Sequence, residues 1–123
     1  GIGYSVIVPP ENRGELIKRM KAEGFPNFQI YPADEREAYQ AIIYLEPNDE
    51  RNRVAIGYDM STDPTRRAAI ERARDTGEAA ATGKVILRQE IDSQKQPGFL
   101  IYLPVYKDGV VPETLNERRE NIQ

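Results

Sequence analysis

The hydrophobic residues of the chain fall into short runs that prolines, glycines and charged stretches separate. The first run, IGYSVIV at residues 2–8, has the composition of a β-strand. We expect this strand to end at Pro9 and Pro10, because proline has no backbone N–H to donate to a ladder.

A helix is predicted over residues 13–23, where three apolar residues share one helical face, namely Leu16, Ile17 and Met20. Asn12 precedes Glu15 by three residues, which is a variant of the capping box. Gly24 stands where a left-handed residue would end the helix.

Several extended segments are expected next. Residues 25–32 contain two prolines, which place them at a sheet edge or in a lead-in. Residues 38–47 are the better strand candidate, because they are rich in isoleucine and tyrosine and stop at Pro47. Residues 48–53 are polar and are expected to form an exposed loop. Residues 54–60 are apolar again.

The start of a second helix is marked by Asp63, which can cap free amides, and by Pro64, which suits the first helical position. Gly77 is expected to end this helix. The apolar stripe of the helix is thin and consists of Ala69, Ile70 and Ala73.

Strands are predicted again over residues 78–91 and 97–106. In the first strand, one face carries Val85, Leu87 and Gln89, and the other carries Ile86 and Arg88. The second strand is apolar on both faces, so we expect both to be covered and the strand to lie in the middle of the packing. The polar tail from Lys107 is expected to lack a cap or a closing strand.

This order of elements indicates an α+β domain, in which helices cover mainly one face of an antiparallel sheet. A chain of 123 residues suits one domain, so residues 1–123 are assigned to a single domain. Such a sheet can hold a small-molecule pocket between itself and the helices.

Composition removes several kinds of chemistry. The chain has no cysteine and no histidine, which excludes thiol nucleophiles, serine–histidine triads and the usual zinc sites, and we expect no cofactor. The formal charge is −3 with acids and bases interleaved, so no nucleic-acid partner is expected. The sequence shows neither a signal peptide nor an apolar run long enough to span a bilayer.

Two possible catalytic motifs fail a physical test. One candidate is a group of three acids that are close in sequence, Glu71, Asp75 and Glu78. Acid–base catalysis needs buried carboxyl groups with raised pKa values, whereas these acids lie in a strongly polar stretch that is expected to face solvent. TGK at residues 82–84 lacks the upstream glycine and the following hydroxyl residue of a phosphate loop. The domain itself is therefore predicted not to be an enzyme.

The segment GYDMSTDPTRRAAIERARDTGEAAATGKVIL, followed by GFLIYLPVY, closely resembles the CHASE family. That family comprises extracytoplasmic sensory domains of membrane-bound histidine kinases and nucleotide cyclases. The aspartate, the helix, the TGKV strand and the LPVY strand occur here in the family's order. YLEPND and GFPNFQIYP also fit the bacterial pattern, so the resemblance covers roughly residues 24–106.

The resemblance implies a PAS-like sensor exposed to the periplasm or cell exterior, within an inner-membrane parent protein that has transmembrane helices on both sides of it. The implied output is a cytoplasmic histidine kinase, or a diguanylate cyclase or phosphodiesterase. The expected partner is a small organic ligand of unknown identity, and a homodimer is a further expectation. The family has a long membrane-proximal helix before this region and one more strand after it. The chain is therefore expected to be trimmed at both ends, which leaves a sheet edge open to a neighbouring chain.

Site residues also follow from the resemblance. In plant cytokinin receptors the acid matching Asp59 bonds an adenine-type ligand, and the stretch matching residues 79–84 lines the same pocket. The threonine matching Thr76 is important to signalling there. Tyr102 is added because its hydroxyl can face a pocket. The expected ligand-binding residues are Asp59, Ala79, Ala81, Gly83 and Tyr102, and the expected signalling residue is Thr76.

Each of these residues also has a simpler structural interpretation. An aspartate before serine and threonine often bonds nearby backbone amides, so Asp59 is equally a local turn or cap. The small residues 79–83 can serve close packing, and Tyr102 can be a core or sheet-surface tyrosine. If Asp59 binds ligand, Asp59→Ala is expected to weaken binding and leave folding nearly intact. The alternative function is a soluble interaction domain that binds a protein partner through its sheet and no small molecule.

Overall fold

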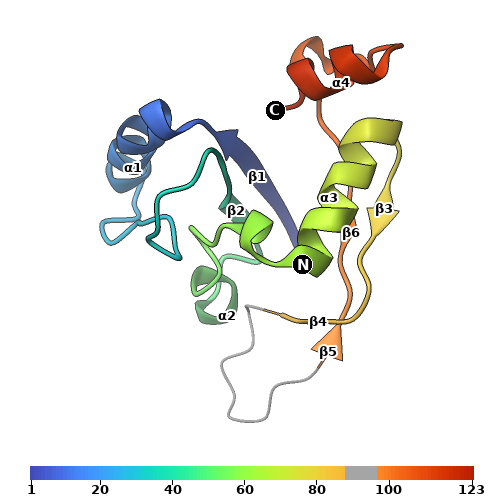
Figure 1. The fold of residues 1–123 in the computed structure, drawn as a ribbon. Helices are drawn as coiled ribbons and strands as arrows, with labels where there is room; N and C mark the ends of the chain where they lie inside the picture. The colour runs from blue at the N-terminus through green and yellow to red at the C-terminus, as the bar shows by residue number, and fades with distance from the viewer. Residues whose placement is uncertain (88–96) are drawn as a thin grey trace. The chain divides into compact units, whose positions relative to one another are not determined.

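The structure is a computed structural model that describes residues 1–87 and 97–123 (Figure 1). Among these residues the chain divides into two units: Gly1–Thr62 form the first, and Asp63–Leu87 together with 97–123 form the second. The assignment of residues 1–123 to one domain stays a prediction.

The first unit is built on two antiparallel strands, β1 (Ile2–Val8) and β2 (Tyr39–Glu46). A 3-10 turn, η1 (Pro10–Asn12), leads from β1 into the helix α1 (Arg13–Ala22). The two predicted strands and the predicted helix are confirmed to within one residue at each end.

The ends of α1 follow the prediction only in part. Gly24 has a φ of +109°, and the amide of Phe25 donates to the carbonyl of Met20 at 3.1 Å, which is the expected left-handed termination. The predicted capping box is wrong, because the Asn12 side chain makes no cap hydrogen bond. Asn12 is the last residue of η1 and has helical backbone angles, whereas a capping side chain needs an extended backbone at its own position.

The hydrophobic core of the first unit lies between α1 and the two strands (Figure 1). Leu16 and Met20 of α1 are buried, as the apolar face predicted, and Ile17 packs against the core while partly exposed. The other buried core residues come from the strands and from the segment that joins α1 to β2: Val8, Phe28, Ile30, Tyr39 and Ala41.

Residues 57–59 run beside β2 and are hydrogen-bonded to it through the backbone. Residues 57–59 bond to Ile42 of β2 on one side and to Tyr31 on the other, with N···O distances of 2.8 to 3.1 Å. Gly57 has a φ of +91°, and a Cβ atom there would stand 2.1 Å from the carbonyl oxygen of Gln29. The turn thus requires glycine both for its backbone angle and for this close approach.

The stretch 48–53 differs from the predicted loop. It contains a short helix, α2 (Glu50–Arg53), whose N-cap Asp49 accepts a hydrogen bond from the amide of Asn52 at 2.9 Å. Asn52 is buried, and its side-chain amide donates to the carbonyl of Pro47 at 2.6 Å. The exposed-loop prediction is wrong for Asn52, because its buried side-chain amide is satisfied by the carbonyl of Pro47, just before this stretch. A 3-10 turn, η2 (Met60–Thr62), closes the unit.

The second unit begins with α3 (Pro64–Thr76). The carboxylate of Asp63 accepts from the amide of Thr65 at 3.0 Å, Pro64 occupies the first helical turn, and Gly77 ends the helix with a φ of +73°. All three end signals are confirmed. Ala69 and Ala73 of the predicted stripe are buried.

The strands of the second unit are short. β3 (Ala80–Ala81) pairs antiparallel with β6 (Ile101–Tyr102), and β4 (Val85–Ile86) pairs antiparallel with β5 (Pro97–Gly98). Residues 88–91 of the strand predicted over 78–91, including Arg88 and Gln89, lie outside the described residues. The α+β class with antiparallel pairing is confirmed.

The prediction that both faces of residues 97–106 are covered is wrong. Four alternate side chains along this segment are exposed, and we call them the apolar stripe: Phe99 (65%), Ile101 (66%), Leu103 (74%) and Val105 (41%). Only the opposite face is covered, with Tyr106 buried and Tyr102 half-buried. Within the described residues, the strands that pair with this segment lie beside it in the plane of the sheet, so they do not cover the face that carries the stripe.

The tail also differs from the prediction. A 3-10 turn, η3 (Lys107–Gly109), is followed by α4 (Leu115–Asn121). The hydroxyl of Thr114 caps α4 by accepting from the amide of Glu117 at 3.2 Å. The prediction that the tail lacks a cap is therefore wrong, because Thr114 and Glu117 have the spacing of a capping box. The amide of Gln123 then donates to the carbonyl of Val105 at 2.9 Å.

Candidate functional site

Asp59 is completely buried in the first unit, with a relative exposure of 0%. Its amide donates to the carbonyl of Tyr31 at 2.8 Å, and its backbone forms an antiparallel bridge with Ala41 of β2. The backbone bonds of residues 57–59 therefore place the carboxylate inside the unit rather than at a loop surface.

Four donors surround the Asp59 carboxylate. Oδ1 accepts from the backbone amide of Gln40 at 2.9 Å and from the amide and hydroxyl of Ser61 at 3.0 and 2.6 Å. Oδ2 accepts from Nε of Arg36 at 2.8 Å. A carboxylate has about two lone-pair positions on each oxygen, so Oδ1 is fully used by its three donors, whereas Oδ2 has one bond and can accept another. The two bonds from Ser61 form the local turn that was the alternative interpretation of Asp59. The ligand role of Asp59 stays a prediction.

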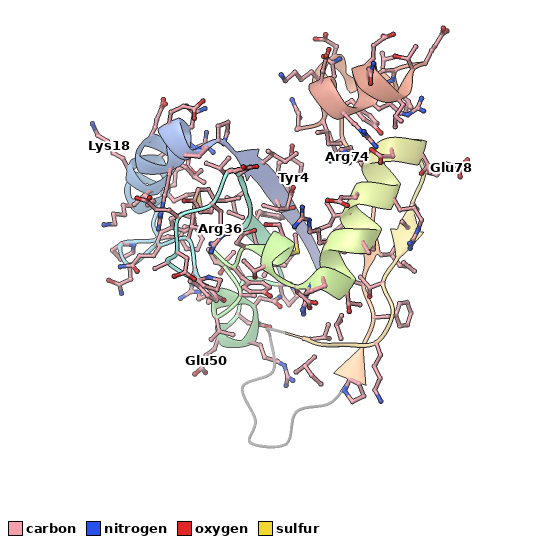
Figure 2. All side chains as sticks on the ribbon, viewed as in Figure 1. Tyr4, Lys18, Arg36, Glu50, Arg74 and Glu78 are labelled. Carbon is pink, nitrogen blue, oxygen red and sulfur yellow. The ribbon has the colours of Figure 1, made fainter. Side chains whose placement is uncertain are left out.

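Arg36 is fixed on several sides. Its Nη2 donates to the carbonyl of Pro32 at 2.6 Å, and its guanidinium carbon lies 5.0 Å from the centre of the Tyr39 ring. Figure 2 shows Arg36 on the segment that joins α1 to β2. This role could not be predicted from the sequence, because Arg36 is one charge among several in a polar stretch and its partner Asp59 is far along the chain.

A second arginine shares the Tyr39 ring. The guanidinium carbon of Arg13, the first residue of α1, lies 5.1 Å from the ring centre, and Nη1 of Arg13 donates to the Tyr39 hydroxyl at 3.3 Å. Tyr39 is only 2% exposed, so the two guanidinium groups are held against a buried ring. The result is a connected set that runs from Asp59 through Arg36 and Tyr39 to Arg13.

The other five predicted residues belong to the second unit. Ala81 and Tyr102 lie on the paired strands β3 and β6, but Tyr102 stands opposite Ala80 and Ala81 opposite Ile101, so the two predicted side chains point to opposite faces of the pair. Ala79 and Gly83 flank β3, and both are exposed. A Cβ atom on Gly83 would meet only the Thr65 methyl group, at 3.7 Å, so this position has room for a side chain or a ligand atom.

Thr76, the predicted signalling residue, ends α3. Its hydroxyl donates to the carbonyl of Arg72 at 2.8 Å and accepts from the amide of Glu78 at 3.2 Å. These bonds tie the last turn of the helix to the residues before β3. The signalling role of Thr76 stays a prediction.

A charged cluster joins the end of α3 to α4, on the side where Figure 2 shows Arg74. The Asp75 carboxylate accepts from Nε and Nη2 of Arg119, both at 3.1 Å, and from Nε of Arg74 at 2.7 Å. The hydrogen bonds from Arg119 and then Arg74 hold the pKa of Asp75 well below its ordinary value. A general acid needs a raised pKa, so this shift has the wrong sign for acid catalysis by Asp75.

Across residues 1–87 and 97–123, acidic residues form no group of three or more that could hold a metal ion. No helix within the same ranges has both the length and the apolar character of a membrane span.

Comparison with known proteins identifies the family of the chain. The family model described as CHASE domain matches residues 1–123, and the chain belongs to the CHASE domain family. CHASE domains are sensory domains of histidine kinases and related receptors. The chain is also 26% identical, over 95 residues, to hybrid signal transduction histidine kinase A of Dictyostelium discoideum. This similarity covers 74% of the chain and 4% of that kinase.

Proposed function

We propose that this chain is the extracytoplasmic ligand-sensing domain of a transmembrane receptor. The observation that carries the proposal is the family match over the whole of residues 1–123. The parent is proposed to be an inner-membrane protein with a histidine kinase output, which the similarity to a hybrid histidine kinase favours over a diguanylate cyclase or phosphodiesterase. The domain is proposed to be PAS-like and to have no catalytic activity of its own.

Asp59 gives this proposal a physical mechanism. Oδ1 already accepts three hydrogen bonds and Oδ2 accepts one, from Arg36, so a ligand that bonds the carboxylate directly is proposed to approach Oδ2 and to displace Arg36 there. Replacement of Arg36 would release the segment between α1 and β2. A ligand of this kind would therefore bind two conformations with different affinity, which is the requirement for a signal.

The proposed contacts of the second unit are Ala79, Ala81, Gly83 and Tyr102, with Thr76 as the proposed transmitter. Gly83 offers the sharpest test, because a Cβ atom there would make only an ordinary contact with the Thr65 methyl group. Gly83→Val should therefore fold normally and still obstruct a ligand that lies against this strand.

The experiment is a thermal-shift screen of small metabolites, adenine derivatives included, on the wild-type chain and on Gly83→Val. We expect at least one compound to raise Tm of the wild type and to raise Tm of the variant less. Gly14→Ala is the matched control, since a Cβ at that helical position meets nothing within 4 Å. Failure of every compound to shift the wild type would contradict ligand sensing. Equal shifts in Gly83→Val and wild type would exclude Gly83 from the site.

The apolar stripe favours a second candidate function, in which the domain pairs with a second copy of itself. The amide of Thr82 donates to the carbonyl of Leu100, so the backbone of Ile101 faces the opposite edge of β6. Residues 97–106 carry no charge, so an antiparallel pair of these segments would place no like charges opposite each other. Such strand pairing is a common route to association at an unprotected sheet edge.

A further inference from the structure

A hollow of about 520 Å³ opens beside Tyr39 in the first unit. Its lining residues come from the start of α1 and from the segment before β2: Pro10, Arg13, Glu35, Arg36, Glu37 and Tyr39. Four of the six carry a charge, so a ligand in this hollow would meet charged groups of both signs.

The two arginines of the hollow differ in whether a carboxylate neutralises their charge. Arg36 is paired with the buried Asp59. Arg13 donates only to neutral acceptors, the Tyr39 hydroxyl at 3.3 Å and the carbonyl of Ala33 at 3.5 Å. Within residues 1–87 and 97–123 no carboxylate pairs with Arg13. Its guanidinium is therefore held in place while its charge is left without a counter-charge.

The two glutamates of the hollow are also uncompensated. Glu35 and Glu37 are exposed, and neither forms an ion pair or a side-chain hydrogen bond with another described residue. The hollow thus presents one fixed positive group and two acidic groups that are open to a ligand.

We propose that this hollow binds a small zwitterion of the α-amino acid class. The ligand carboxylate meets the guanidinium of Arg13, where two parallel N–H···O bonds are possible. The ligand ammonium meets Glu35 or Glu37. This proposal rests on the proposed ligand-sensing function and places a ligand in a hollow that adjoins Asp59 through Arg36 and includes none of the contacts proposed for the second unit.

Other small ligands fit these charges less well. A phosphate dianion would meet Arg13 but would be repelled by Glu35 and Glu37, and a simple amine would be attracted to the glutamates but repelled by Arg13. The set formed by Asp59, Arg36 and Tyr39 also holds one side of the hollow before a ligand arrives, which lowers the entropic cost of binding.

The test is isothermal titration calorimetry of the chain with each of the common L-amino acids. We expect at least one to bind, and Arg13→Gln to weaken that binding about tenfold or more, because a charge-assisted pair is lost. Arg13→Lys should retain part of the affinity, and the double variant Glu35→Gln, Glu37→Gln should weaken binding. Arg19→Gln, an exposed arginine of the same helix, is the matched control and should bind as the wild type does.

Charge selectivity supplies the second arm of the experiment. The decarboxylated amine of the bound amino acid, its N-acetyl derivative and inorganic phosphate should each bind at least about tenfold more weakly. The proposal is overturned if no amino acid binds, if Arg13→Gln binds as the wild type does, or if any of these three probes binds equally well. A metabolite that shifts Tm in the screen while all amino acids fail would overturn this inference and leave ligand sensing standing.

Discussion

Nε of Arg36 lies 2.8 Å from Oδ2 of Asp59, and this bond joins a fully buried carboxylate to a guanidinium whose side chain is 20% exposed. The two residues are 23 positions apart, so the bond ties the segment before β2 to the turn after residue 57. A buried carboxylate is tolerated only when donors surround it, and Asp59 has them.

Asp59→Ala should destabilise the first unit substantially. The substitution leaves the amides of Gln40 and Ser61 without their acceptor and breaks a buried ion pair, so we expect a loss of about 3–5 kcal/mol in the free energy of unfolding. This replaces the sequence-based expectation of nearly intact folding. Asp59→Asn keeps an oxygen for the two amides and should lose less. Urea unfolding measures both, and a loss below about 0.5 kcal/mol for Asp59→Ala would contradict the role of these bonds.

The cluster at Asp75 predicts an acid-dependent stability. The ordinary pKa of an aspartate is 3.8, and folding lowers the pKa of Asp75 below this value. As the pH falls, the unfolded chain therefore takes up the proton before the folded chain does. The stabilisation is complete above that ordinary value and is lost as the pH falls below it. Arg119→Gln should make this loss less steep, since Arg119 is the largest cause of the shift. Acid titration of the thermal midpoint measures it.

Arg67→Gln is the control for this titration, because Arg67 and Glu71 form an ion pair whose side chains are 63% and 44% exposed. Exposed pairs contribute little, so this variant should keep the acid dependence of the wild type. If Arg119→Gln also kept it unchanged, the cluster would not be the source of the acid dependence.

Gly57→Ala should be strongly destabilising. The backbone angle of +91° alone costs a non-glycine residue about 1–3 kcal/mol, and the added Cβ would also clash with the Gln29 carbonyl. Gly14→Ala is the matched comparison: it lies in α1 with open space around it and should stabilise the helix by about 0.5–1 kcal/mol. Thermal unfolding of both variants separates backbone strain from the general effect of adding a methyl group.

The apolar stripe predicts concentration-dependent self-association. Leu103→Lys places a charge on the most exposed of the four side chains and, with its counterpart in a second copy, would set like charges close together. We expect the variant to remain monomeric at concentrations where the wild type forms dimers in sedimentation experiments. Lys107→Gln, just beyond the segment, is the control. A wild type that stays monomeric at all accessible concentrations would rule out this pairing.

Local signals account for the features that the sequence predicted well. The prolines after residue 8, the cap at Asp63 and the glycine at residue 77 each act within a few residues, so β1 and α3 could be predicted closely. The local turn at Asp59 was also foreseeable, because its partner Ser61 is two residues away.

The features that the sequence missed depend on distant contacts or on caps within polar stretches. Arg36 could not be singled out, because its importance comes from a partner that the fold brings near. The exposure of the apolar stripe depends on which elements lie above it, which alternation along one strand does not determine. Asp49 and Thr114 cap α2 and α4 within stretches whose polarity suggested loops.

The double-sided bonding of residues 57–59 limits how this region can change during evolution. Because neighbouring side chains of an extended segment point in opposite directions, gaining or losing one residue here would turn the acid at position 59 away from its donors. Insertions and deletions in relatives should therefore fall outside this stretch, for example among the polar residues between β2 and α2.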